Sequence, residues 1–324
     1  MDRPANRDEY SITRYWLVLA AVPIFLTLGG LWLGTTWFFA RYSGFNFNAE
    51  IDYKLDPKGN SDIIFYGDST ALVGIIPAEI ERSTGLATYN LALSAAVVSS
   101  TANLTIDRYL ASHRRPKLIV LYMTPWGSGG FTRTKKALPL YEAALVMLRY
   151  GSPGQVLRFF GSHPSSIVKT AFYNWRFVLS SDLSGQAYLR TFTDMERNRG
   201  FTPFEGPQGI PDGYEIVRDD DPVDRRFIEA FRRHYSKDGT RVVVYFPPLP
   251  DSDSAGSRYA GFYQTISDNE FRTVPHQLVA FDERCIHLLP NAAKDESIRV
   301  GEFLRRVLDG MQALNTGAVT QAGN

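Results

Sequence analysis

The sequence predicts an α/β fold in which a parallel β-sheet carries helices on both faces. After residue 61, strand-like and helix-like segments alternate, and the strand-like ones are nearly continuous apolar runs. Strands that are apolar along their whole length are typical of parallel sheets whose two faces are both buried. A long apolar run near the N-terminus further predicts one transmembrane helix ahead of this domain.

The first predicted element is an uncleaved membrane anchor at residues 15–40. This run contains no charged residue, and Arg14 and Arg41 flank it. About 20 apolar residues cross the hydrocarbon core of a bilayer. Trp16 and Trp37 stand near the two ends, where aromatic side chains favour the membrane interface. A cleaved signal peptide is the alternative, but its apolar core would be only about 7–15 residues long.

The charges around this run predict its orientation. Three arginines lie in residues 1–14, whereas only Arg41 and Lys54 follow closely. The positive-inside rule therefore favours a cytoplasmic N-terminus. The sequence predicts a single-pass protein of the inner (cytoplasmic) membrane whose domain is extracytoplasmic, in the periplasm.

Short apolar runs predict the strands, after a polar and turn-rich segment at 41–61 that is expected to be a linker. IIFY ends at a glycine, while KLIVLYM and RVVVYF are continuous apolar runs of strand length. The expected strands are residues 62–66, 87–93, 117–123, 241–246 and 277–281.

Proline near its start and glycine after its end predict a helix at 77–85. Apolar residues recur every four positions at 223–235, which is typical of one buried helical face. Further helices are expected at 101–113 and 297–311. The domain thus covers 62–312, with an insertion of helices and loops at about 127–222 and a disordered tail at 313–324.

Composition excludes several classes of protein. The formal net charge of the 324 residues is +1, which argues against a nucleic-acid binder. A single cysteine, Cys285, excludes a disulfide framework within the chain and a cysteine-rich metal site. We expect no metal and no cofactor.

The residues that could perform chemistry follow the predicted strands. In an open α/β sheet, ligands bind outside the carboxyl ends of the strands. Ser69 stands there, after Gly67 and Asp68, which are expected to shape the turn. A serine needs a base to become nucleophilic. Of the five histidines, His287 is the best placed, because it follows the last predicted strand and precedes the last helix.

These segments resemble the SGNH (GDSL-type) hydrolase superfamily, most closely its membrane-anchored branch associated with O-acylation of exported polysaccharides. The resemblance covers most of residues 62–308 and is carried by IIFYGDST, TYNLALS and FDERCIHLLPNAAKDES. It implies a flavodoxin-like, three-layer α/β/α sandwich. It also implies that Ser69 is the nucleophile, that His287 is the general base, and that the main chain at Ser69 donates to the oxyanion.

The acid of the expected triad departs from the family pattern. Members usually have an aspartate three residues before the histidine, and here that position is Arg284. Asp282 is expected to support His287 instead, with Glu283 as the alternative.

The expected oxyanion donors depart from the family pattern as well. Ala95 stands where the family has a glycine, and its main-chain N–H remains a candidate donor. The family's asparagine after the third strand is replaced by Thr124, Pro125 and Trp126, so the Thr124 hydroxyl and the Trp126 indole are candidates. Asn90 in the second loop is a further candidate for substrate binding, and the alternative is that it organises this loop.

The resemblance implies a serine-dependent acyltransferase or esterase that acts on O-acyl groups, acetyl first, of an exopolysaccharide or envelope glycan. Whether the acyl-serine passes to a sugar hydroxyl or to water is open. Trp126 and Trp175 fit either a sugar-stacking surface or the core. The expected partners are the glycan, the bilayer through residues 15–40 and a multi-pass membrane acyltransferase. The alternative is a catalytically inactive SGNH-like module that binds a glycan or scaffolds a polysaccharide synthesis or secretion complex.

Overall fold

The structure is a computed structural model of the chain. It describes residues 7–35, 41–42, 44–125, 140–180, 184–204, 206–207, 209, 225–251, 260–261, 263–281 and 286–321.

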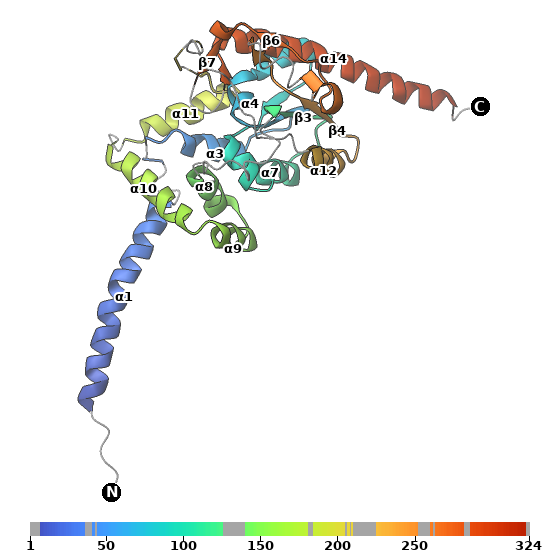
Figure 1. Cartoon of the computed structure of the whole chain (residues 1–324). Coiled ribbons are helices and arrows are strands. Elements are labelled where there is room, and N and C mark those ends of the chain that lie inside the picture. Colours follow the sequence, from blue (N-terminus) through green and yellow to red (C-terminus); the bar gives the residue numbers. More distant parts are fainter. Residues whose placement is uncertain are drawn as a thin grey trace.

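A parallel four-stranded sheet forms the centre of the domain (Figure 1). Its strands are β1 (Ile63–Gly67), β2 (Thr88–Asn90), β3 (Leu118–Tyr122) and β4 (Arg241–Tyr245). They lie in the order β2-β1-β3-β4, with Ile63 opposite both Thr88 and Leu118. This order matches the start of the flavodoxin-like order, whose ligand site lies at the switch point between β1 and β3. The predicted parallel sheet is confirmed.

Helices cover both faces of the sheet, because successive strand residues point to opposite sides. Leu118, Val120 and Tyr122 of β3 pack in one apolar cluster with helices α4, α5 and α14. Ile119 and Leu121 pack in a second cluster with α7 and α12. These helices are α4 (Ser69–Gly74), α5 (Pro77–Thr84), α7 (Leu104–Ser112), α12 (Arg225–Tyr235) and α14 (Pro290–Gln321).

The predicted linker at 41–61 contains a buried helix, α3 (Phe47–Leu55), so that prediction was wrong. Phe47, Ile51 and Leu55 recur every four residues and pack against the inserted helices. The polar residues between them hid this face in the sequence. One of these, Asp52, is buried and accepts hydrogen bonds from Arg149 at 3.0 Å and from the hydroxyls of Tyr150 and Tyr188 at 2.8 Å.

The predicted insertion is helical in the part that the structure describes. It contains α8 (Tyr141–Tyr150), α9 (Pro153–Ser162), α10 (Ser165–Ser180) and α11 (Gln186–Arg197). Residues 126–139 and 210–224 lie outside the described residues. Helix α8 contacts α3 and α6 (Ala95–Ser100), while α10 contacts α1.

Helix α1 (Arg7–Thr35) projects from the domain and meets it only at its C-terminal end (Figure 1). Within the described residues, no helix has both the length and the apolar character needed to cross a membrane. Residues 36–40 of the predicted anchor lie outside the described residues. The large exposed apolar side chains of α1 are Ile12, Tyr15, Trp16, Leu17, Val18, Leu19, Val22, Ile24, Phe25 and Leu26.

The C-terminal part differs from the prediction in two ways. The tail at 313–324, predicted to be disordered, continues α14 as a helix to Gln321 and extends away from the domain (Figure 1). The tail contains no proline, so no residue in it breaks the helix that α14 begins. The predicted strand at 277–281 belongs to an antiparallel pair of β7 (Val279–Phe281) with β8 (Ile286–Leu288), apart from the central sheet.

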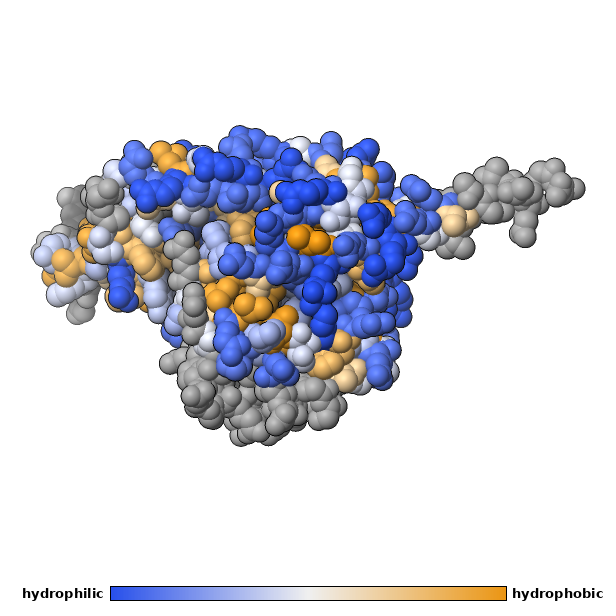
Figure 2. All heavy atoms as spheres, turned by 90° about the horizontal axis from the view of Figure 1, so that it is seen from above, coloured by the Kyte–Doolittle hydropathy of each residue, from blue (hydrophilic) through white to orange (hydrophobic). Residues whose placement is uncertain are grey.

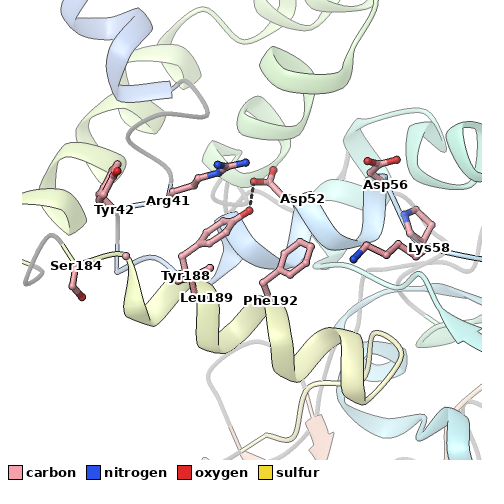
Figure 3. A pocket seen from close by; sticks show the side chains of 11 residues that line it. Arg41, Tyr42, Asp52, Asp56, Lys58, Ser184, Tyr188, Leu189 and Phe192 are labelled. Atoms are coloured by element: carbon pink, nitrogen blue, oxygen red, sulfur yellow. Dashed lines mark hydrogen bonds between the residues drawn. The ribbon is translucent and has the colours of Figure 1, made fainter.

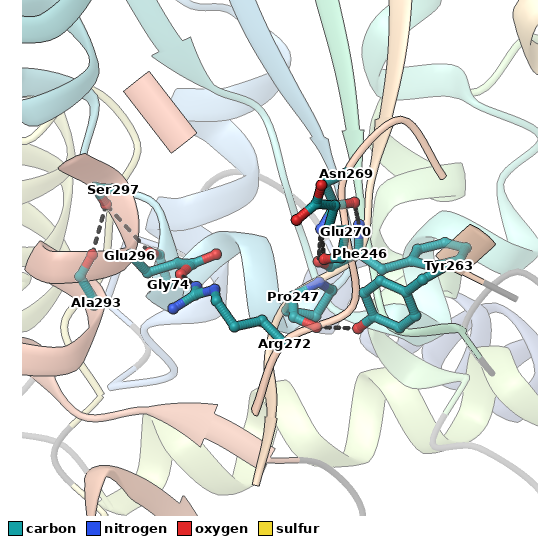
Figure 4. A network of polar contacts seen from close by, with 10 residues as sticks. All are labelled: Gly74, Phe246, Pro247, Tyr263, Asn269, Glu270, Arg272, Ala293, Glu296 and Ser297. Carbon is teal, nitrogen blue, oxygen red and sulfur yellow. Dashed lines mark hydrogen bonds and ion pairs between the residues drawn. The ribbon is translucent and has the colours of Figure 1, made fainter. Parts of the chain in front are cut away.

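Polar contacts tie the segment before this pair to the sheet and to α14 (Figure 4). Arg272 forms an ion pair with the buried carboxylate of Glu296 on α14. Arg272 directly precedes β6 (Thr273–Val274), which pairs with β5 (Leu249–Pro250). Asn269 donates a hydrogen bond to the carbonyl of Phe246, just after β4, at 3.0 Å. These contacts fix where the chain enters the β7–β8 pair.

Candidate active site

The sequence Gly67-Asp68-Ser69 forms a tight junction between β1 and α4. Gly67 ends the strand, Asp68 is the N-cap and Ser69 is the first residue of the helix. A Cβ on Gly67 would lie 1.6 Å from the carbonyl oxygen of Tyr122 on β3. Only glycine therefore permits this approach of the two strands, which places Ser69 at the switch point of the sheet.

Asp68 holds this junction together. One carboxylate oxygen accepts hydrogen bonds from the main-chain N–H of Thr70 at 3.0 Å and from its hydroxyl at 2.5 Å. The other accepts from the N–H of Thr124 at 3.1 Å and from its hydroxyl at 3.0 Å. The side chain is buried, so this carboxylate shapes the site, as the sequence predicted.

The structure brings Ser69 and His287 together. Ser69 Oγ lies 2.9 Å from His287 Nε2, although 218 positions separate the two residues. His287 is on β8, which contacts α4, and its side chain is buried. The predicted proximity of the two side chains is confirmed, while their catalytic roles stay a prediction.

Phe204 is a site residue that the sequence did not reveal. Its ring centre lies 4.6 Å from that of His287, with an angle of 41° between the planes. The segment that carries it crosses α4, because the N–H of Thr202 donates to the carbonyl of Leu72 at 3.2 Å. Phe204 lies inside the predicted insertion, shortly after α11, and no motif or spacing in the sequence marks it.

Asn90 does not lie in the site in the way expected. Its side-chain amide donates to the carbonyls of Ala71 at 2.7 Å and Ile75 at 3.1 Å, and its oxygen accepts from the N–H of Ala92 at 3.0 Å. The side chain is buried and joins the second loop to α4. Its assignment to substrate binding was wrong, because its polar atoms serve the fold.

Thr124 is also committed to the fold. Its hydroxyl proton goes to Asp68, so the hydroxyl does not donate to an oxyanion in this arrangement. The other predicted donor after β3, Trp126, lies outside the described residues. The same holds for Asp282 and Glu283, the two candidates for the acid that supports His287.

Ala95 begins α6 directly after the second loop. Among the described residues other than glycine, a positive φ occurs at Ala102, Asn103, Arg199 and Asp238. Ala95 is not one of them. An alanine at this position therefore carries no strain from a positive φ, and a glycine is not needed here.

Buried ionisable groups support the second loop from outside the sheet. Lys54 on α3 donates to the carbonyl of Ala92, and Ser94 donates to the carboxylate of Glu142 on α8. Burial lowers the pKa of Lys54 to about 7, against the effect of nearby Glu50. Burial also raises the pKa of Glu142 to about 7. No pattern in the sequence indicates either contact, because Lys54 and Glu142 lie outside the motifs.

A cavity of about 600 Å³ lies between α3, α11 and the segment that follows α1 (Figure 3). Tyr188 and Phe192 of α11 line it with parallel rings 6.0 Å apart, together with Arg41 and Lys58. Trp175, a predicted sugar-stacking candidate, lies elsewhere. Its indole N–H donates to the carbonyl of Gly30 on α1 at 3.0 Å.

Within the described residues, no group of three or more histidine, cysteine, aspartate or glutamate side chains could hold a metal ion. Comparison with protein-family models, with curated proteins and with solved structures gave no match. Ser69 and His287 therefore define a candidate serine–histidine site on geometry alone.

Proposed function

We propose that the protein is a serine-dependent acyltransferase or esterase of the SGNH type. The observation that supports this most strongly is the distance of 2.9 Å between Ser69 Oγ and His287 Nε2 at the carboxyl end of β1. A neutral imidazole at this distance can accept the hydroxyl proton while Ser69 attacks an acyl carbon. The bond between the acyl carbon and the donor's oxygen would then break, and His287 would give the proton to that leaving oxygen. A sugar hydroxyl or water would next attack the acyl carbon and lose its proton to His287. The bond to Ser69 would break, and His287 would return this proton to the serine oxygen.

The proposed substrate is an O-acyl, first of all O-acetyl, group of an exopolysaccharide or envelope glycan. The main-chain N–H groups at Ser69 and Ala95 are the proposed oxyanion donors. Attachment to a membrane through α1, and an acyl supply from a multi-pass membrane acyltransferase, belong to the same proposal. The exposed apolar side chains of α1 support the membrane part of it.

Covalent labelling tests the nucleophile. The full chain in detergent micelles is treated with a fluorescent fluorophosphonate, which reacts with activated serines. We expect labelling of the wild type and none of Ser69→Ala. His287→Gln should label about 100-fold more slowly or less, because it lacks the base. Ser162→Ala, at an exposed position on α9, serves as the matched control and should label like the wild type.

A glycan-binding or scaffold module is the second candidate. It is favoured by the commitment of Asn90 and Thr124 to the fold, since a missing oxyanion donor costs about 100- to 1000-fold in turnover. The cavity lined by Tyr188 and Phe192 offers such a module an aromatic surface. Equal labelling of wild type and Ser69→Ala would decide for this candidate.

A further inference from the structure

Helix α10 buries three polar side chains beside the apolar Ala171 and Val178, and it exposes three large apolar ones. Ser166, Thr170 and Asn174 face inward and are only 3%, 2% and 1% exposed. On another face, Val168, Phe172 and Leu179 are 55%, 64% and 80% exposed. A helix on the surface of a water-soluble domain normally shows the opposite pattern.

The polar side chains on the inward face of α10 have hydrogen-bond partners on neighbouring helices. These hydrogen bonds fix the rotation of α10 about its own axis. The hydroxyl of Thr170 donates to the carbonyl of Ser166, one turn earlier in α10, at 2.7 Å and also lies 3.1 Å from the carbonyl of Tyr141 on α8. The side-chain oxygen of Asn174 accepts from the Asn48 amide on α3 at 3.1 Å. Turning the apolar face inward would carry Asn174 away and leave the buried amide of Asn48 without its acceptor, at a cost of about 1–3 kcal/mol in the free energy of folding.

The exposed face of α10 lies beside α1. The two helices contact each other, and Trp175 on α10 donates its hydrogen bond to Gly30 on α1. Gly30 lies well inside the apolar run at 15–40, so a membrane that covers this run also reaches the level of α10. The part of α1 between Tyr15 and Thr27, which is exposed on nearly all sides, is only about 20 Å long, less than the roughly 30 Å hydrocarbon core.

Charges flank the exposed face of α10 in the way that a lipid interface favours. Lys169 and Arg176 are exposed next to it, and long cationic side chains of this kind reach lipid headgroups while their stems lie on apolar surface. Phe172, Trp175 and Leu179, with Arg176 and Ser180, also line a shallow hollow of about 450 Å³. By contrast, the face seen from above in Figure 2, opposite the side from which α1 leaves, is mostly hydrophilic.

We propose that α10 is a second membrane-inserted element, whose exposed apolar face lies in a lipid bilayer beside α1. The domain would then rest on the membrane in one fixed orientation. This inference rests on the proposed membrane attachment through α1, and it does not depend on acyl transfer.

The test measures the depth of single labelled positions in the full chain. Cys285 is replaced by alanine, and one cysteine is introduced by Phe172→Cys, Leu179→Cys or, as the control, Leu189→Cys on α11. Leu189 is 55% exposed, close to Phe172 in this respect. Each cysteine carries a polarity-sensitive fluorophore, and the protein is placed in nanodiscs of phosphatidylcholine and phosphatidylglycerol. Spin-labelled lipid then quenches from the bilayer, and iodide quenches from water.

We expect lipid quenching at positions 172 and 179 to exceed that at 189 several-fold, with the reverse order for iodide. Equal quenching at the three positions would overturn the proposal. Shielding of 172 and 179 from both quenchers, with energy transfer between chains, would also overturn it, because a second copy would then cover the face.

The failure of this inference can be told apart from failure of the membrane attachment itself. Flotation of the full chain with vesicles of the same lipids reports on attachment. A chain that does not float contradicts the attachment through α1 and overturns the inference with it. A chain that floats but shows water-exposed labels at 172 and 179 contradicts only the insertion of α10.

Discussion

At the scale of single residues, Gly67 allows β1 to approach β3 closely enough to present Ser69 at the switch point. A Cβ at this position would meet main chain, which cannot move out of the way as a flexible side chain could. Gly67→Ala should therefore lower the free energy of unfolding by about 3 kcal/mol or more, at the upper end of what overpacking a core costs. The midpoint of unfolding in urea, followed by circular dichroism, measures this loss. Gly154→Ala, where a Cβ meets nothing within 4 Å, should change the midpoint little.

Asp68 gives the second prediction at this scale. Asp68→Asn replaces an acceptor oxygen by an NH₂ group, which must then face a donor from Thr70 or Thr124. We expect the free energy of unfolding to fall by about 1–3 kcal/mol and fluorophosphonate labelling of Ser69 to fall with it. Asp194→Asn on α11, where the side chain is half-exposed, is the control. Unchanged stability of Asp68→Asn would mean that the carboxylate does not hold the junction.

The sequence predicted part of the site at this scale. Ser69 and His287 could be paired because each follows a strand and matches a family motif. Asn90 and Thr124 were misassigned because a side chain that can donate to an oxyanion can equally satisfy a buried carbonyl or carboxylate. Asn90 bonds the carbonyls of Ala71 and Ile75, and Thr124 bonds the carboxylate of Asp68. These neighbours come into place only in the folded chain, so the sequence alone does not show which use each side chain has.

At the scale of elements, α3 belongs to the domain although it precedes the first strand. It supplies Asp52 to a buried network and Lys54 to the second loop. A chain that begins at residue 44 should therefore unfold cooperatively on heating, whereas one that begins at residue 57 should not. Calorimetry and limited proteolysis of the two purified chains check this. A cooperative transition of similar midpoint in both would restore the linker interpretation.

The contacts of α3 and α8 with the second loop predict how stability depends on pH. Folded Glu142 keeps its proton up to a pKa of about 7, whereas the unfolded chain loses it near the ordinary value of 4.5. The free energy of unfolding should therefore fall as pH rises through this window. For Lys54 the folded pKa of about 7 lies below the ordinary 10.5, so stability should rise again from about pH 7 upward.

Urea unfolding at a series of pH values measures these slopes. The two groups together should produce a minimum near pH 7, with changes of roughly 3 kcal/mol below it and roughly 5 kcal/mol above it at most. Glu142→Gln should remove the fall below pH 7 and leave the rise above it. A curve for Glu142→Gln that matches the wild type would contradict the assignment to Glu142.

Strands of the central sheet were the most predictable elements. β1, β3 and β4 are runs of apolar residues with clear ends, so their positions follow from local composition. β8 was not foreseen, because Ile286–Leu288 is too short to give a periodic signal. α3 was missed because its buried polar residues are satisfied by partners about 100 positions away, such as Arg149. Such long-range pairing leaves no trace in a local pattern.

At the scale of the whole molecule, the exposed apolar side chains of α1 and α10 belong to two helices that contact each other. A chain that begins at residue 44 lacks α1 but keeps α10. We expect it to bind vesicles of phosphatidylcholine and phosphatidylglycerol more weakly than the full chain, yet measurably in a sedimentation assay. The double variant Phe172→Asp and Leu179→Asp should reduce this binding at least tenfold, whereas Leu189→Asp should not. Binding unaffected by the double variant would assign the residual affinity to another surface.

The separation of 218 positions between Ser69 and His287 has a consequence for biosynthesis. The ribosome makes the serine 218 positions before it makes the histidine. Contacts that are so distant in sequence also form slowly, because a large loop must close first. The Ser69–His287 pair therefore cannot form before β8 has been synthesised. Synthesis of β8 sets the earliest moment at which the serine can meet its proposed base.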